Sequence, residues 1–429
     1  MAEAESPDRT VNDVYTLVIP TYNRSAQLAT LLRYLQRNHV AFPVLVLDSS
    51  GQDHRQRNRD IAKRLSLAVT YVEYDEDTRP FDKFRDGIGM VKTDFCGLCA
   101  DDDLVIVDGI RRCVEHLVRH PELSAAHGYY FTFVEPVHDP RAMDLTGILY
   151  YTPDIASDDS VERLRDLFRN YQALTYATFR TRILRRVFDA VRPVESMLAR
   201  ELLSSALAVV FGKAARLPCF TNGRSLDASA SYQHWHPLEW LMESPTALFQ
   251  EYARYREILV TAVMVAPGHV RSREETNRAI DLVHMFYLVR HLPLDAYDFL
   301  MKHALAGANL ADVWANLQVQ LPLIRASAYL SPDQLASESS QVPAGREMGF
   351  RESVRAVLAS IVRGRRSSRG YARGSWPKDL TTPIRHYRLH EAFVRPRPPE
   401  LFSIGKDDVT HILGALDTYT ESEDSPRPQ

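Results

Sequence analysis

The segment YTLVIPTYNRSAQLATLLRYL, residues 15–35, joins two patterns of different period. Tyr15–Pro20 is a short apolar, β-branched run, which is typical of a buried strand. Four leucines then recur at i, i+3, i+4 and i+7, which is the apolar stripe of an amphipathic helix. These are Leu28, Leu31, Leu32 and Leu35. The segment therefore predicts a strand followed by its crossover helix, the opening unit of an α/β fold.

The same alternation continues for the first hundred residues. Strand patterns return at Pro43–Leu47, Ala68–Tyr74 and Phe95–Cys99. Between them lie a polar helix near Arg55–Leu65 and a helical face made by Phe84, Ile88 and Val91. Strands that alternate with helices predict a right-handed, largely parallel sheet with helices on both faces.

Beyond Ala100 the rhythm changes. Asp108 is placed to cap a helix that runs to Arg119. Further strands are predicted at Tyr129–Val134, Leu174–Arg180 and Lys213–Leu217, with a helix over Met197–Phe211. This pattern completes a mixed sheet that ends near His236.

The rest of the chain has a different composition. Residues 237–330 are almost purely helical in pattern, residues 331–345 are a polar linker with Pro and Gly, and residues 346–429 are basic with a disordered tail. Residues 1–13 carry acids where a secretory signal needs a basic start and an apolar run, so they are expected to be a disordered leader. The predicted α/β domain is therefore residues 14–236, followed by a helical domain, a linker and a basic segment.

Composition excludes several classes of protein. A formal charge of −3 on 429 residues argues against a dedicated nucleic-acid binder. Four cysteines are too few to form a disulfide framework for a chain of this length, so we expect free thiols in a reducing compartment. No apolar run approaches the roughly 20 residues that cross a bilayer. The sequence predicts a cytoplasmic protein, at most peripheral to a membrane.

Polar residues follow three of the predicted strands where each one ends. They are Pro20, Thr21, Tyr22, Asn23 and Arg24 after the first, Asp48, Ser49, Ser50 and Gly51 after the second, and Asp101, Asp102 and Asp103 after the fourth. Ligands of open α/β sheets bind at such strand ends. Three adjacent carboxylates in a cleft repel one another unless a cation offsets their charge, and Mg²⁺ or Mn²⁺ takes carboxylate oxygen while keeping sites for phosphate. A metal that bridges a diphosphate is therefore expected here.

These motifs carry a resemblance to a known family. TLVIPTYNR at 16–24, LDSS at 47–50 and CADDDLV at 99–105 resemble the family 2-like glycosyltransferases of the GT-A fold, over roughly residues 14–236. The resemblance implies a mixed α/β sheet and a nucleotide cradle formed by Pro20, Thr21, Asn23, Arg24, Asp48, Ser49 and Asp102. It also implies a DxD motif that holds the metal. That motif is either Asp101 with Asp103, or Cys99 with Asp101, so Asp101 belongs to it in both alignments.

The resemblance implies a catalytic base at the start of the helix over 199–213, where the family often has Glu-Asp. Here the pair is Glu201-Leu202, so the second acid is missing. Glu201 is the leading candidate base for an inverting transfer, with Glu195 and Asp227 as alternatives. A Glu that begins an amphipathic helix for dipole reasons is the structural alternative.

Two pairs of residues could assist the diphosphate. His234 and His236 stand where the family often places a metal or diphosphate contact, although a packed loop histidine is the more common outcome. Lys83 and Arg224 could neutralise phosphate, although a surface position is the default for such cations.

Three other motifs resemble known kinds of binding site. Cys96, Cys99, Cys113 and His116 have a spacing that zinc sites use, but Cys96 and Cys99 are three apart in a buried strand and should face opposite sides. Gly87 and Gly89 begin a dinucleotide-type pattern but precede a strand rather than follow one. The arginine-rich run 351–373 could contact a membrane surface or an anionic acceptor, or simply be solvated.

The sequence thus predicts a metal-dependent glycosyltransferase that uses Mn²⁺ or Mg²⁺. The donor would be a nucleoside-diphosphate sugar, with UDP the default, and the acceptor a saccharide or lipid-linked saccharide, plausibly in bacterial surface polysaccharide or glycoconjugate assembly. A sugar-nucleotide nucleotidyltransferase is the enzymatic alternative, but PTYNRS lacks the Gly-rich loop of that class. A catalytically weak nucleotide- or sugar-binding module is the second alternative. The helices over 237–330 could shape the acceptor site or form a homodimer face.

Overall fold

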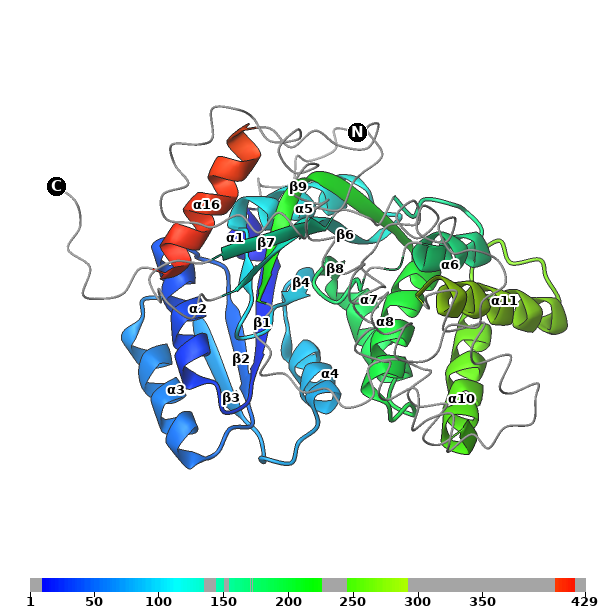
Figure 1. The fold of residues 1–429 in the computed structure, drawn as a ribbon, viewed down its shortest axis with the longest axis horizontal. Helices are drawn as coiled ribbons and strands as arrows, with labels where there is room; N and C mark the ends of the chain where they lie inside the picture. Colours follow the sequence, from blue (N-terminus) through cyan, green and yellow to red (C-terminus); the bar gives the residue numbers. More distant parts are fainter. Residues whose placement is uncertain are drawn as a thin grey trace, which may run out of the picture.

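The fold begins with a helical turn, α1 (Val11–Val14), and the strand β1 (Tyr15–Thr21) that the sequence predicts. The computed structural model describes residues 10–134, 144–149, 154–169, 171, 173–225, 245–291 and 406–420. Within these residues the chain forms a nine-stranded mixed sheet with helices on both faces (Figure 1). The α/β class and the helical extension after the sheet are confirmed.

The first half of the sheet is parallel. After β1 come α2 (Ser25–Arg37), β2 (Val44–Asp48), α3 (Gln52–Arg64), β3 (Val69–Glu73), α4 (Pro80–Met90) and β4 (Phe95–Leu98). The strands lie in the order β3-β2-β1-β4. In the β1–β2 register Thr21 lies opposite Asp48, so the two strands end together. This register places the polar loops after β1 and β2 side by side at one edge of the sheet.

The second half of the sheet is mixed. It comprises β5 (Leu104–Val105), α5 (Val107–Arg119), β6 (Leu123–Val134), β7 (Asp144–Leu149), α6 (Ser160–Arg169), β8 (Thr178–Arg180), α7 (Thr181–Ala190), α8 (Met197–Phe211) and β9 (Lys213–Ser225). β8 runs antiparallel to β4, β6 runs antiparallel to β8, and β9 lies parallel to β6. β5 pairs with the end of β9, which brings β9 beside the acidic turn.

Two apolar cores lie on the two faces of the sheet. On one face Leu17 and Ile19 of β1 pack with α2, α5 and α16 (Lys406–Thr420). On the other face Val18 packs with α4, α6, α7 and α8, and with α10 (Pro245–Met264) and α11 (Arg273–His291). Cys96 belongs to the second core and Cys99 to the first, as their odd spacing predicts. All four cysteines are buried thiols.

Several local predictions were imprecise. Ile106 is the N-cap residue of α5, and Asp108 lies in the first turn of that helix and pairs with Arg111, because the helix begins two residues earlier than a cap at Asp108 predicts. β6 and β9 are longer than predicted, and β8 is shorter. The sequence prediction missed α1, β5, β7, α6, α7 and α16. Of these, α1 and β5 are too short to show a pattern, whereas α6, α7 and α16 have apolar stripes of helical period that the prediction did not use.

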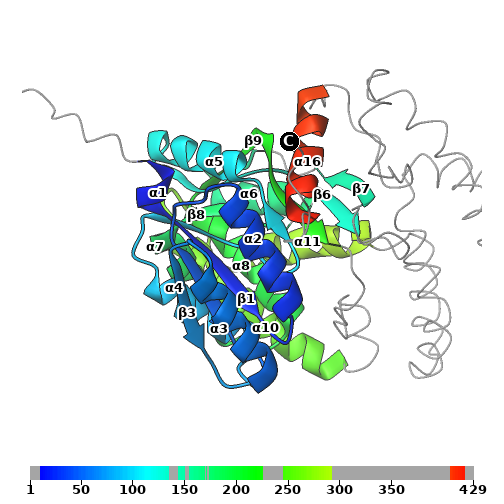
Figure 2. The ribbon, with the colours of Figure 1, turned by 90° about the vertical axis from the view of Figure 1, so that its left-hand side faces the viewer.

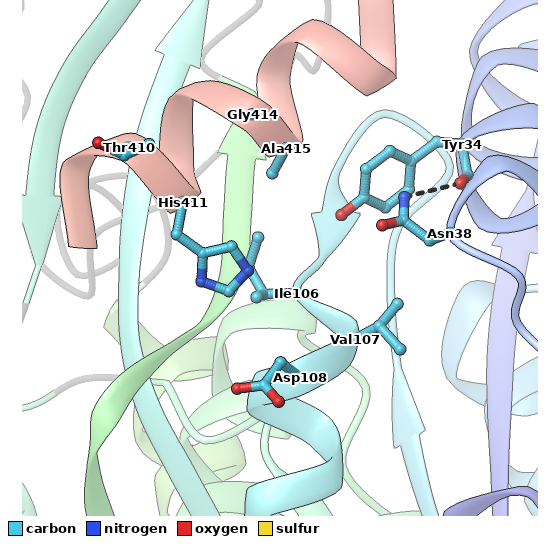
Figure 3. Close-up of a pocket in the computed structure, with 9 residues that line it drawn as sticks. All are labelled: Tyr34, Asn38, Ile106, Val107, Asp108, Thr410, His411, Gly414 and Ala415. Atoms are coloured by element: carbon cyan, nitrogen blue, oxygen red, sulfur yellow. Dashed lines mark hydrogen bonds between the residues drawn. The ribbon is translucent and has the colours of Figure 1, made fainter. Parts of the chain in front are cut away.

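The C-terminal helix α16 lies against α2, although more than 360 residues separate the two in sequence (Figures 1 and 2). Tyr419 makes edge contacts with the rings of Tyr34 and Phe133. The hydroxyl of Tyr34 in turn donates to the Val105 carbonyl at 2.8 Å, directly behind the acidic turn. Near the start of α16 a cavity of about 300 Å³ separates it from α2 and α5, with His411 on one wall and Asp108 on another (Figure 3).

The helices predicted for residues 237–330 are present where the structure describes that range, as α10 and α11 at the end of the molecule opposite α3 (Figure 1). They pack on α8 and α6. None of the described helices is both long and apolar enough to span a bilayer.

Candidate functional site

The loop after β1 is fastened to the loop after β2 by Asn23. Its backbone N–H donates to Ser50 Oγ at 2.9 Å, and its side-chain Oδ1 accepts from the Gly51 N–H at 2.8 Å. Asn23 has a φ of 54°, a left-handed conformation that Asn tolerates better than most residues. The two loops therefore form one unit at the end of the sheet.

Asp48 lies beneath this unit and is fully buried. Its carboxylate accepts from the Ser50 N–H and from Asn58 Nδ2, both at 2.7 Å, and from the Tyr71 hydroxyl. Burial would raise the pKa of Asp48, but the hydrogen bonds from Ser50, Tyr71 and Asn58 outweigh it and hold that pKa below the ordinary value. In this structure the carboxylate predicted to contact the nucleotide holds its own loop in place.

The acidic turn after β4 is tied to the same unit. Thr21 Oγ1 donates to Asp101 Oδ2 at 2.7 Å, and Arg24 Nη1 lies 3.4 Å from Asp101 Oδ1. The same Arg24 nitrogen donates to Asp102. Asp101 and Asp102 therefore converge on one cation. Of the three acids, Asp102 has the most accessible side chain, 21% exposed against 5% for Asp101 and 6% for Asp103.

Asp103 is turned the other way, toward β9. Its Oδ1 accepts from the Ser225 N–H at 2.8 Å, and Arg224 Nε lies 3.9 Å from its Oδ2. Burial raises the pKa of Asp103 to about 6 and that of Asp101 to about 7, because the lost hydration outweighs the contacts of Asp103 with Arg224 and Ser225 and those of Asp101 with Thr21 and Arg24. Each acid becomes easier to ionise when a further cation approaches.

Arg224 links the acidic turn to the predicted base. Its guanidinium stacks over the Tyr176 ring at 5.2 Å, and its charge acts on Asp103 and on Glu201 of α8. Burial raises the pKa of the Glu201 carboxyl, and the Arg224 cation and a hydrogen bond with Tyr171 oppose that rise. Glu201 is therefore within reach of the charge of Arg224, which also acts on Asp103 of the acidic turn.

The two alternative bases differ from Glu201. The side chain of Glu195 is 75% exposed and lies 3.8 Å from Arg254 of α10. Asp227 falls outside the described residues. Glu251 of α10 accepts from the Ser196 N–H at 2.8 Å and so fixes the start of α8, the helix that carries Glu201. The helical extension thus positions the candidate base.

The predicted site residues fall into two layers. Tyr22, Asn23, Arg24 and Asp102 are exposed or partly exposed, as is Pro20, and can meet a ligand. A supporting layer beneath them consists of Thr21, Asp48, Ser49, Ser50 and Asp101, all buried. His234 and His236 fall outside the described residues, so the structure does not place them.

The buried position of Lys83 differs from the surface position that the sequence analysis expected. Its side chain is buried beneath the loops of β1 and β2, where a surface cation was the default. A signal existed, because Lys83 shares the inner face of α4 with Phe81, Gly87 and Ile88. Asn58 and Tyr71, which hold Asp48, were also missed, since each lies in an otherwise ordinary helix or strand pattern.

The carboxylates at the strand ends are the candidate metal ligands. Across the described part of the chain, no three His, Cys, Asp or Glu side chains form a ready cage for an ion. Mg²⁺ and Mn²⁺ sites, however, often use one or two carboxylates, with water and substrate phosphate as the other ligands. Asp102 and Asp101, which already share the Arg24 cation, fit a site of that kind.

Comparisons with known proteins found several similar solved structures. Among solved structures, S. aureus TarS matches with a TM-score of 0.41 and 13% identity, over 65% of this chain and 43% of that one. TarS 1–349 in complex with UDP-GlcNAc matches with a TM-score of 0.43 and 12% identity, over 65% of this chain and 72% of that one. The mannosyltransferase PcManGT from Pyrobaculum calidifontis, in complex with GDP-Man and Mn²⁺, matches with a TM-score of 0.37 and 15% identity, over 76% of this chain and 90% of that one.

The chain spans less than half the length of the first of these TarS chains. No curated protein matches it. The family model described as glycosyl transferase family 2 matches residues 16–189, which include β1, β2, β4 and the acidic turn. Residues 16–189 therefore match the family whose motifs the sequence resembles.

Proposed function

We propose that this protein is a metal-dependent glycosyltransferase that moves a sugar from a nucleoside-diphosphate donor to a hydroxyl acceptor, with inversion at the anomeric carbon. One observation carries the proposal. Arg24, Asp101 and Asp102 converge at the strand ends, and Arg224 links their turn to the carboxyl of Glu201. A site for a diphosphate and a nearby base are the two parts that such a transfer needs.

The exposed layer would bind the donor. The loops after β1 and β2 offer Pro20 and Asn23 to the nucleoside, with Thr21, Asp48 and Ser49 supporting them from below. Arg24, which can form two parallel hydrogen bonds to phosphate oxygen, is partly exposed beside Asp102. UDP is the first nucleotide to test.

We propose Asp102 and Asp101 as the residues that would hold Mn²⁺ or Mg²⁺. A bound divalent ion would bridge the diphosphate and offset the charge of the leaving group. Asp103 was predicted as a metal ligand. Because its carboxylate contacts Ser225 and Arg224, we propose that Asp103 instead holds the end of β9 in place. His234 and His236 are kept as candidate ligands from the segment after β9.

Glu201 would take the proton of the acceptor hydroxyl as that oxygen attacks the anomeric carbon. A base must be ionised before it acts and must hold a proton afterwards, so a pKa above the ordinary value suits this role. The charge of Arg224 limits the rise in the pKa of Glu201 and so keeps its carboxyl ionised near neutral pH.

The acceptor we propose is a saccharide or a lipid-linked saccharide in bacterial surface polysaccharide or glycoconjugate assembly. A cytoplasmic location with peripheral membrane contact through the arginine-rich run 351–373 would suit a lipid-linked acceptor. That run lies outside the described residues, and a homodimer through the helical extension is a further proposal.

Calorimetric titration tests the donor assignment. The purified chain would be titrated with UDP, GDP, dTDP and CDP, each with Mn²⁺ and again with EDTA. We expect binding of one base only with the metal present, and loss of that binding in Asp102→Ala with the fold intact. Equal binding with EDTA would refute the metal role, and no binding of any nucleotide would refute the proposed donor site.

A further inference from the structure

Lys83 lies at the centre of the supporting layer. Its ammonium donates to the Thr21 carbonyl at 3.0 Å and to Ser49 Oγ at 2.7 Å. Thr21 ends β1 and Ser49 follows β2. A single side chain of α4 therefore fastens both loops that form the proposed donor site.

The side chain of Lys83 is too deeply buried to meet a ligand directly. The residue is 2% exposed. Burial lowers the pKa of Lys83 to about 8, although the carboxylates of Asp48 and Asp101 favour its charged form. One cation thus offsets two buried acids, which would otherwise repel each other beneath the loops.

Gly87 explains how Lys83 reaches this position. It lies one turn after Lys83 on the same face of α4, and a Cβ there would fall 2.5 Å from Cδ1 of Leu47 on β2. The missing side chain lets α4 approach the sheet closely. An unbranched lysine one turn earlier can then extend along the strands to their ends.

We propose that Lys83 is a positioning residue for nucleotide binding: it holds the loops after β1 and β2 in their binding conformation without touching the nucleotide. The expected effect on nucleotide binding rests on the proposed function. Its structural part, the restraint of two loops, can be measured in the ligand-free protein.

The first measurement is amide hydrogen exchange of the full chain without ligand. Lys83→Met keeps the unbranched length but removes the charge and both hydrogen bonds. We expect exchange to rise by about tenfold or more in peptides that cover residues 19–25 and 47–52. Lys92→Met makes the same substitution at an exposed lysine just after α4 and should leave both peptides unchanged.

The second measurement is calorimetric affinity for UDP, GDP, dTDP and CDP with Mn²⁺. We expect Lys83→Met to weaken binding by about tenfold to a hundredfold, as residues that orient a binding group commonly do. Ser49→Ala removes one of the two acceptors of Lys83 and should weaken binding less. The double variant should bind no worse than Lys83→Met, because both changes break the same contact.

The outcomes separate the inference from the proposed function. Unchanged loop exchange in Lys83→Met would overturn the positioning role, whether or not nucleotides bind. Additive effects of Lys83→Met and Ser49→Ala on binding would also overturn it, since the two residues would then act separately. A wild-type chain that binds no nucleotide would refute the proposed function, while faster loop exchange would still support the restraint by Lys83. If Lys83→Met does not fold, faster loop exchange in Ser49→Ala supports the restraint, and unchanged exchange overturns it.

Discussion

Glu201 is the residue on which the proposed chemistry depends. Glu201→Gln keeps the size of the side chain but cannot accept a proton, so we expect turnover to fall by about 10²- to 10⁴-fold. Donor affinity should stay within about twofold, because Glu201 faces Arg224 rather than the loops of β1 and β2. Release of the nucleoside diphosphate measures the first quantity and calorimetry the second.

Glu195→Gln is the matched control for this variant. Glu195 precedes α8, is largely exposed and pairs with Arg254, so its variant should retain most of the turnover. The rate of the wild type should rise with pH as Glu201 ionises, and Glu201→Gln should lose that limb of the profile. A Glu201→Gln enzyme that keeps its turnover would place the base elsewhere, with Asp227 the next candidate.

At the scale of elements, the packing of α11 on α10 predicts a sensitivity to acid. His284 of α11 is buried, and its two ring nitrogens contact the Ile280 carbonyl at 2.8 Å and the Tyr255 hydroxyl at 2.7 Å. Burial lowers the pKa of His284 to about 4, below the ordinary 6.5. Between these values the unfolded chain binds a proton that the folded chain does not, so the free energy of unfolding should fall as pH falls through this window.

Denaturant midpoints at several pH values test this prediction. In His284→Gln the midpoint should be lower at neutral pH but should depend less on pH between about 6.5 and 4. His411→Gln changes an exposed histidine of α16 and should retain the wild-type dependence. Equal pH dependence in all three proteins would mean that His284 is not buried in its neutral form.

At the scale of the whole molecule, α16 closes one face of the sheet. Leu416 is fully buried in the same core as α2 and β1. Leu416→Ala should therefore lower the free energy of unfolding by about 2–5 kcal/mol. Leu282→Ala makes the same deletion at a leucine that is 51% exposed and should cost about 0.5 kcal/mol or less. Similar midpoints for the two variants in chemical denaturation would show that α16 does not belong to the core.

The positions of β1 to β4 and of α2, α3 and α4 followed from local pattern, within one or two residues in most cases. Each of these elements shows its own period in the side chains, and the period does not depend on distant residues. Short elements such as β5 and α1 have no comparable pattern, whereas α16 has an apolar stripe, Val409, Ile412, Leu413 and Leu416, that the sequence prediction did not use. The order of the two short elements comes from contacts with segments far away in the chain, which a local pattern does not contain.

The candidate site divides in the same way. The sequence by itself determined which loops carry polar residues and that parallel strands bring them to one edge, because strand direction follows from the alternation of elements. Only the tertiary structure decided that Asp48 and Lys83 are buried supports, that Asp103 faces β9 and that Arg224 joins Glu201 to the acidic turn. Burial and pairing depend on the elements packed above each side chain, and those elements come from residues far apart in the sequence.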